Sequence, residues 1–528
     1  MMMFPFSRSN CLRGIAVLSL WFGSGIPAVQ ALPEYQDGGS HGVSGLRKGA
    51  NQEISVDAQR AFVRWQGFNV EAGETFRIKG NASQTLLNLV TGSDPSRIGG
   101  MVDSGVRFIL ANPNGISLVK GGQIVAPSVL LTTAKFNPQE WLKGLTDTSG
   151  VVGESGYLRF DKGSSINVEG TIHALESAGG VGGSIRLLAD QLRLGSTAVL
   201  QATGAQGGGE ILVGGSWQNS TPVLGQATRV LIEQGAVLDA SALFSGDGGT
   251  IVAWSDITNP QSRTEVHGRL SARGGAEQGR GGRVETSGAW IDVEGSVVNT
   301  LAADGGAGYW LLDPTSLYVG TSSDGTASTG SRSILSLAQL NTNLDTNGTV
   351  SLQASQDIVL DADFTFDGST GDADRTLIFD APLTVLLGSI DVEGTQTEQL
   401  NVEIGTTTSQ NLAVMSANRS IQTNDGDITI RGNVGGGQGL TLDAGSGVIS
   451  LGDISGGLSG SYWDGTSSIS TTNVAANTTL INYTGGPGTG NAIVLDFANG
   501  VATRNGSALA YTGTLPSNLK TGASGVFC

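Results

Sequence analysis

Short apolar runs separated by turn-forming residues recur along most of the chain. Residues 230–232, 251–254 and 290–293 are examples, rich in β-branched or aromatic side chains and set among Gly, Asp and Ser. Such runs are typical of β-strands, and no apolar face at helical spacing lasts long enough for a globular helix. The connections are too short for crossover helices, so successive coils are expected to pair in parallel, one rung per coil.

A two-glycine phrase recurs beyond residue 164: two glycines, a polar residue and then an apolar strand. It begins at Gly182, Gly208, Gly248 and Gly281, so its second glycines are 26, 40 and 33 residues apart. Self-similarity without a strict period indicates a solenoid whose coils have variable turns. A short amphipathic stretch at 334–344 is the one place where a helical turn or two is expected.

The best-specified turn is Asn112-Pro113-Asn114-Gly115, between the apolar runs 108–110 and 116–118. Pro113 presets φ for the first corner position, Asn114 tolerates left-handed geometry and Gly115 allows positive φ. The pattern therefore predicts strand, tight turn, strand, with two side-chain amides presented outward. The alternative is that these residues form a turn without any functional role, because such turn-forming dipeptides are common between strands.

Composition narrows the class of protein. The 528 residues include 82 glycines, 38% are hydrophobic and the formal net charge is −17. Glycine does not occupy every third position and apolar residues are plentiful, which excludes collagen and disorder. Basic residues are scattered singly, so nucleic acid and anionic membrane surfaces are poor partners.

The first 31 residues have the pattern of a signal peptide. Arg8 and Arg13 precede the apolar run 14–22, and Ala31 ends a small-residue cleavage site, so cleavage is expected before Leu32. No later segment approaches a transmembrane helix. The mature chain would keep only Cys528, which excludes an internal disulfide.

After the signal peptide, residues 32–49 are polar and glycine-rich and are expected to form a flexible lead. Trp65 and Phe68 are large enough to close the open end of a β-stack and are expected to be cap core rather than ligand-stacking residues. The predicted divisions are a signal peptide (1–31), a cap and first core (32–165), a β-helix continuation (166–314), a low-complexity connection (315–345), a second solenoid segment (346–455) and a glycine- and threonine-rich tail (456–528).

Catalytic chemistry finds little support. The densest acidic patch, Asp361, Asp363, Asp367, Asp372 and Asp374, fails the calcium-loop template because Phe366 stands where glycine is required. The three histidines, His41, His173 and His267, are far apart and have no metal spacing. No catalytic residue, metal site or cofactor is predicted, and the chain is not expected to be an enzyme.

Three stretches, 61–70, 90–100 and 112–116, taken in this order and spacing, resemble the secretion domain of two-partner secretion exoproteins. This is the family of filamentous haemagglutinin and the high-molecular-weight adhesins. The resemblance is specific over about 46–135 and looser to about 320. It implies an all-β, right-handed parallel β-helix with an N-terminal cap.

The resemblance also implies a functional site. Asn112, Pro113, Asn114 and Gly115 match the motif associated with recognition by an outer-membrane β-barrel transporter. Trp65, Phe68 and the turn Asp94-Pro95-Ser96 are accompanying matches, whereas the second family motif, Asn-Pro-Asn-Leu, is not found.

The expected function is that of a Gram-negative exoprotein, exported through the periplasm and then secreted or held at the cell surface. It would act there as an adhesin-like binding protein on an unknown host or bacterial receptor. The alternatives are a β-helical glycan-active enzyme and a haem-acquisition or cytolysin-type exoprotein.

Overall fold

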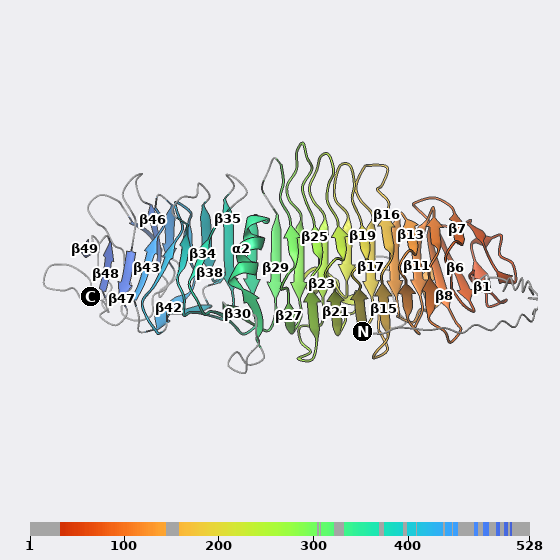
Figure 1. The fold of residues 1–528 in the computed structure, drawn as a ribbon, viewed down its shortest axis with the longest axis horizontal. Helices are drawn as coiled ribbons and strands as arrows, with labels where there is room; N and C mark the ends of the chain where they lie inside the picture. Colours follow the sequence, from red (N-terminus) through yellow and green to blue (C-terminus); the bar gives the residue numbers. More distant parts are fainter. Residues whose placement is uncertain are drawn as a thin grey trace, which may run out of the picture.

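The computed structural model is a long rod of stacked β-coils (Figure 1). It describes residues 32–451, except 144–157, 304–305, 307, 321–331, 369–373, 394–398, 408, 415, 437–438 and 446, and five strands between 469 and 508. The predicted signal peptide, Cys528 and most of the predicted tail lie outside the described residues. Along most of the rod each strand pairs in parallel with the strand three places later, as β10 does with β13. The fold is a parallel β-helix, which confirms the predicted fold class.

Three sheets run along the rod, and a fourth continues one of them. Sheet 1 contains β3 (Val43–Ser44), β5 (Glu53–Val56), β7 (Thr75–Lys79), β10 (Met101–Ser104), β13 (Gln123–Ala126), β16 (Thr171–Ala174), β19 (Val199–Gln201), β22 (Val237–Asp239), β25 (Arg269–Ser271) and β28 (Val297–Asn299). Sheet 2 contains β2 (Ser40–His41), β6 (Arg60–Trp65), β8 (Thr85–Val90), β11 (Arg107–Ala111), β14 (Ser128–Thr132), β17 (Ser184–Leu188), β20 (Glu210–Val213), β23 (Thr250–Trp254), β26 (Arg283–Ser287), β29 (Tyr309–Asp313), β32 (Thr349–Gln353), β35 (Arg375–Asp380), β38 (Leu400–Ile404), β41 (Ile428–Ile430), β44 (Val448–Leu451), β46 (Thr479–Thr484) and β45 (Ile469–Asn473).

The other two sheets complete the three-sided coils. Sheet 3 contains β9 (Ser96–Ile98), β12 (Ile116–Leu118), β15 (Ser165–Val168), β18 (Gln191–Leu194), β21 (Arg229–Ile232), β24 (Arg263–Val266), β27 (Trp290–Asp292), β31 (Ser333–Ser336), β30 (Ser316–Gly320), β33 (Asp357–Leu360), β36 (Leu383–Leu386), β39 (Asn411–Val414) and β42 (Asn433–Gly436). Sheet 4 contains β34 (Phe364–Phe366), β37 (Ile390–Val392), β40 (Arg419–Gln422), β43 (Gly439–Asp443), β47 (Ile493–Asp496), β48 (Val501–Arg504) and β49 (Ser507–Ala508).

The core fills the inside of the coils. Because side chains alternate along a strand, each strand sends every second residue inward, where it meets its counterparts above and below. In sheet 1 these stacked residues are all fully buried: Val102, Ile124, Ile172, Leu200, Leu238, Leu270 and Val298. Each strand of sheet 1 has to contribute one apolar residue to this column. A short apolar run is enough for that, whatever the length of the loop that separates it from the next run.

The residues expected to be a flexible lead are instead an ordered cap, so that expectation is wrong. β2 pairs antiparallel with β6 and β3 pairs antiparallel with β5, which covers the first edges of sheets 2 and 1. The short strands β1 (Glu34–Tyr35) and β4 (Gly49–Ala50) pair with each other, and Tyr35 contacts the Trp65 ring edge-on. The unpaired backbone groups at the edge of a sheet need hydrogen-bond partners. The backbone of a polar, glycine-rich segment can supply these partners as well as the backbone of an apolar segment can.

The two-glycine phrases mark places where backbones of adjacent coils touch. A Cβ on Gly208 or Gly281 would fall within 3.0 Å of a carbonyl oxygen in the next coil, that of Ala240 or Thr300. A Cβ on Gly209 or Gly282 would likewise meet a carbonyl of the preceding coil. Each phrase therefore needs glycine at both positions because the chain passes between two backbones there.

These close approaches build what we call the loop ridge. It comprises the described residues of the loops 175–183, 202–209, 240–249, 272–282 and 300–308, which rise from one edge of the rod between β16 and β29 (Figure 1). Backbone hydrogen bonds join successive loops, including Gly208 N–H to Asp247 O at 2.9 Å and Gly248 N–H to Arg280 O at 2.8 Å. The ridge is thus a continuous stack rather than a set of independent loops.

One helix interrupts sheet 1. The amphipathic stretch predicted at 334–344 is β31 followed by α2 (Leu337–Asp345), which stands between β28 and β34 (Figure 1). Gln339, Asn343 and Asn347, spaced four apart, use buried side-chain amides in place of a strand's backbone. Gln339 bonds Gly295 N and Ser296 O, Asn343 accepts from Val298 N at 3.0 Å, and Asn347 donates to Val298 O at 3.0 Å.

The remaining divisions of the chain stay predictions. Within 315–345 the described residues form β30, β31 and α2, which continue the stack. A second short helix, α1 (Pro138–Leu142), lies in an excursion on the outer face of sheet 2. There Trp141 packs over apolar residues such as Ile109 and Leu130.

Candidate functional site

The turn at 112–115 lies where β11 leaves sheet 2 and β12 enters sheet 3. Its four residues are closed by a hydrogen bond from Gly115 N–H to Asn112 O at 3.0 Å. Gly115 has a φ of +111°, which favours glycine, whereas Asn114 does not have positive φ. The predicted strand, tight turn and strand are present.

Asn112 holds this turn onto the coil before it. Its side chain is fully buried and its Nδ2 donates to Asp94 O and to Ser96 Oγ, both at 3.0 Å. Its Oδ1 accepts from Asn114 N–H at 3.0 Å. Ser96 N–H also donates to Gly115 O at 3.0 Å. The two turns that the sequence singled out are therefore fastened together across adjacent coils.

The expectation that both amides point outward is wrong. Asn112 faces inward, where its amide donates to the Asp94 carbonyl and to the buried Ser96 hydroxyl of the coil below. Asn114 is exposed, but its Nδ2 donates to Gly92 O at 2.9 Å. The exposed part of the paired turns consists of Asn114 with Asp94 and Pro95, while Pro113 is half-buried and Ser96 and Gly115 are buried. We call this surface the paired-turn corner.

Trp65 and Phe68 lie in the core at the capped end of the rod. Both are essentially fully buried, and their rings meet edge-on with centroids 6.0 Å apart. Phe76 contacts both rings, and Phe68 also contacts Phe108 of the β11 coil. This aromatic cluster packs directly beneath the coils that carry the corner.

Asn88 is a buried residue that the sequence analysis missed. Its Oδ1 accepts from Trp65 Nε1 and its Nδ2 donates to Ile109 O, each at 3.0 Å. It therefore connects the aromatic cluster to β11. The sequence does contain a sign of this role: Asn88 is the one asparagine in the mainly apolar run 85–90. A polar side chain at such a position needs hydrogen-bond partners inside the protein.

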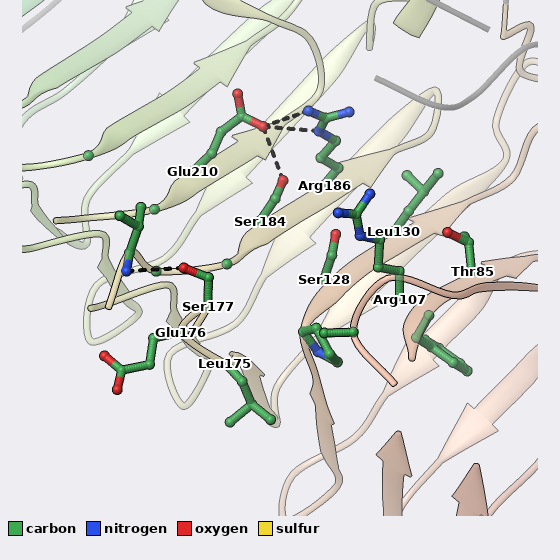
Figure 2. A pocket seen from close by; sticks show the side chains of 18 of the residues that line it. Thr85, Arg107, Ser128, Leu130, Leu175, Glu176, Ser177, Ser184, Arg186 and Glu210 are labelled. Carbon is green, nitrogen blue, oxygen red and sulfur yellow. Dashed lines mark hydrogen bonds and ion pairs between the residues drawn. The ribbon is translucent and has the colours of Figure 1, made fainter. Parts of the chain in front are cut away.

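A pocket of about 910 Å³ lies at the opposite edge of sheet 2, where its strands begin (Figure 2). We call it the edge pocket. The first residue of each of seven successive strands lines it: Arg60, Thr85, Arg107, Ser128, Ser184, Glu210 and Thr250. Trp141 of α1 lines one part and the ridge residues Leu175, Glu176 and Ser177 another. None of these residues was singled out as a site from the sequence.

A group of buried carboxylates lies further along sheet 2. Glu285 is fully buried, and its carboxylate accepts from Gln218 N–H and from Ser287 Oγ, both at 2.8 Å. Burial raises the pKa of Glu285 to about 8, although these two hydrogen bonds act in the other direction. Burial and the nearby Asp380 carboxylate raise the pKa of Asp313 to about 6.

The raised pKa of Glu285 predicts a pH dependence of stability. Its ordinary value is 4.5, so its contribution is complete below about pH 4.5 and is lost as the pH rises towards about 8. We expect the free energy of unfolding to fall across this window by up to about 1.4 kcal/mol per pH unit. Glu285→Gln, which keeps an acceptor for Gln218 N–H, should flatten the profile. Urea unfolding at several pH values measures it, and an unchanged slope in the variant would contradict the assignment.

Within the described part of the chain, no group of three or more His, Cys, Asp or Glu residues is arranged to hold a metal ion. None of the helices in this part of the chain is long and apolar enough to cross a membrane. Of the predicted acidic patch, Asp372 lies outside the described residues.

A family model and a solved structure are similar to this chain. Residues 35–255 match the family model of the TPS secretion domain. A crystal structure of the HMW1 secretion domain from Haemophilus influenzae is similar, with 16% sequence identity and a TM-score of 0.38, covering 77% of this chain and 100% of that chain. No curated protein matches the chain. The matched range contains the paired-turn corner, the aromatic cluster and the edge pocket.

Proposed function

We propose that this chain is a two-partner secretion (TPS) exoprotein whose secretion domain is the matched range 35–255, and that its cognate outer-membrane transporter recognises it at the paired-turn corner. Such exoproteins are made by Gram-negative bacteria and exported through a dedicated transporter. Of the turn Asn112-Pro113-Asn114-Gly115 and the turn Asp94-Pro95-Ser96 beneath it, the exposed Asn114, Asp94 and Pro95 would make the contact. The buried Asn112, Ser96 and Gly115 would hold these groups in place. Trp65 and Phe68 support the corner from the cap.

The mutual attachment of the two turns is the observation that carries this proposal. Asn112 is committed to Asp94 and Ser96, so the coil below fixes the position of Asn114. A corner held by buried hydrogen bonds presents its exposed groups in one geometry and loses little entropy when it binds a partner. Its position next to the aromatic cluster, through Phe68 and Phe108, places it close to the capped end of the rod.

Asn114→Ala tests the proposal. The variant loses one exposed amide and the bonds that it donates to Gly92 O and Asn112 Oδ1, so it should remain folded with a stability loss of about 1 kcal/mol. We expect its export to fall by about tenfold, equivalent to about 1.4 kcal/mol of recognition free energy. The measurement is the ratio of chain in the medium to chain in the periplasm, in cells that express the cognate transporter.

Asn259→Ala is the matched control. Asn259 is likewise next to a proline in the sequence, and its Oδ1 accepts from Gln261 N–H at 3.0 Å, but it lies beyond residue 255. It should be exported normally. Equal export of the Asn114 variant and the control would refute recognition at the corner.

After export, we propose that the protein acts as an adhesin-like binding protein and not as an enzyme. The loop ridge supports this role, because it carries Leu243 and Phe244 with 50% and 62% of their surfaces exposed. Exposed apolar side chains on a rigid surface are typical of contacts with other proteins. Binding of the secreted chain to host and bacterial cells tests the role, and a chain that binds neither would contradict it.

A further inference from the structure

The edge pocket has the form of a channel along the rod. The first residues of β6, β8, β11, β14, β17, β20 and β23 follow one another in register along its floor. At about 4.8 Å per rung, seven rungs span about 30 Å. An extended polypeptide of about nine residues has this length, at about 3.3 Å per residue. The shape suits a segment lying along the rod axis.

Cationic side chains line the floor, but two of the three are already engaged. Arg60 lies over the Trp141 ring, 5.0 Å from its centroid, and donates to Trp141 O at 3.2 Å. Arg186 donates to Glu210 Oε2 through Nε and Nη2, at 3.0 and 2.9 Å (Figure 2). These contacts hold the Arg60 and Arg186 guanidiniums against neighbouring groups of the pocket.

Arg107 is different. It is exposed and makes no ion pair or side-chain hydrogen bond with any residue that the structure describes. Thr85 is its register partner on one side, and Ser128 precedes the residue paired with Phe108 on the other (Figure 2). A free guanidinium between two hydroxyls offers donors only to acidic or strongly accepting groups, since guanidinium has no acceptor.

The carboxylates of the pocket are also occupied. Glu210 binds Arg186 and Ser184, and Glu176 accepts from the backbone N–H of Ala205 at 2.8 Å. Three arginines against these two carboxylates leave the pocket lining with a net positive charge, on a chain whose net charge is −17. Electrostatic complementarity selects an anionic occupant for this channel.

We infer that the edge pocket binds an extended acidic segment of the cognate transporter, with Arg107 as its central charge contact. The lining residues run from Arg60 to Thr250, inside the matched range 35–255, which places the pocket in the domain that the transporter handles. The inference rests on the proposed function but concerns a second surface. β11 joins the two, since it begins at Arg107 in the pocket and ends at Ala111 beside the corner.

Charge reversal at Arg107 tests the inference. We expect Arg107→Glu to weaken binding of the purified full chain to detergent-solubilised transporter by at least about tenfold at low salt. The difference should shrink as salt rises, because the contact is charged and partly exposed. Arg107→Lys should retain most of the affinity. Immobilised transporter and a salt series provide the measurement.

Arg269→Glu is the matched control. Arg269 is also exposed and is the first residue of its strand, but β25 lies in sheet 1, away from the pocket. Circular dichroism and thermal unfolding establish that both variants are folded. Unchanged transporter binding by folded Arg107→Glu would overturn the inference, as would an equal loss in the Arg269 control or a loss that does not depend on salt.

Two further outcomes separate this inference from its premise. If Arg107→Glu lowers retention on immobilised heparin but leaves transporter binding intact, the pocket is an anionic glycan site and the inference is wrong. If the wild-type chain does not bind the transporter at all, the proposed function itself fails. Weak binding by Arg107→Glu together with normal binding by Asn114→Ala would support the pocket while rejecting the corner.

Discussion

Replacing Asn112 with alanine is expected to lower the free energy of unfolding of the N-terminal coils by about 4 kcal/mol. The change removes four hydrogen bonds of a fully buried side chain and leaves Ser96 Oγ, Asn114 N–H and Asn114 Nδ2 without this partner. Because stability in a stacked fold is local, the effect should concentrate in residues 85–118. Hydrogen–deuterium exchange and urea unfolding measure it.

Asn167→Ala provides the comparison for Asn112. Asn167 is a half-exposed asparagine of β15, and its change should cost no more than about 0.5 kcal/mol. Asn112→Asp should be nearly as harmful as the alanine variant, because it loses both donors and buries an unpaired charge. Native exchange rates in Asn112→Ala would show that the two turns do not depend on each other.

Gly281→Ala is expected to destabilise the middle of the rod by about 3 kcal/mol or more. The added methyl group would lie within 3.0 Å of Thr300 O and Gly308 N, which are backbone atoms that cannot rotate away. The coils around β26 and β29 would have to separate, breaking bonds such as Gly281 N–H to Gly306 O. Thermal unfolding should show an earlier transition, with protection lost first around residues 272–308.

Gly306→Ala separates the clash from a general effect of substitution in the ridge. A Cβ at Gly306 meets nothing within 4 Å, and its φ is not in the left-handed region. This control should be neutral or slightly stabilising, because alanine restricts the unfolded chain. Equal melting temperatures for the two variants would mean that the coils are not in backbone contact at the two-glycine phrase.

The sequence predicted the stacked β-coils because their signals are local. β-branched runs mark strands, and Gly115 needs a positive φ that a tight turn requires. The two-glycine phrases were recognised as a repeat, but their cause was not. Steric contact with a neighbouring coil, as at Gly208 and Ala240 O, depends on which residues stack, and variable turn lengths conceal that.

The same limit explains the errors at the corner and at the cap. Turn propensity says which residues bend the chain but not which way a side chain faces, so Asn112 was expected outward although Asp94 and Ser96 bind it inside. Residues 32–49 lack an apolar pattern and were therefore not recognised as ordered. They are ordered because β2 and β3 pair with the otherwise open edges of β6 and β5. The match to residues 35–255 supports the family without testing which residues the transporter contacts.

The edge pocket was beyond prediction for a related reason. Arg60, Arg107 and Arg186 are isolated in the sequence, and each alone is an ordinary surface arginine. Only the register of seven strands brings them to one channel, and the long excursion between β14 and β15 hides that register.

Helix α2 gives the rod a built-in weak point under tension. Sheets 2 and 3 run past it without a break, through β29–β32 and β30–β33, whereas backbone pairing along the remaining face stops at β28 and starts again at β34. At this level a force along the long axis would be resisted by the backbone hydrogen bonds of two continuous sheets instead of three. Side-chain amides of α2 and of Asn347 just after it would carry the rest of the load. The rod would therefore be expected to break at this level into two pieces that each stay folded.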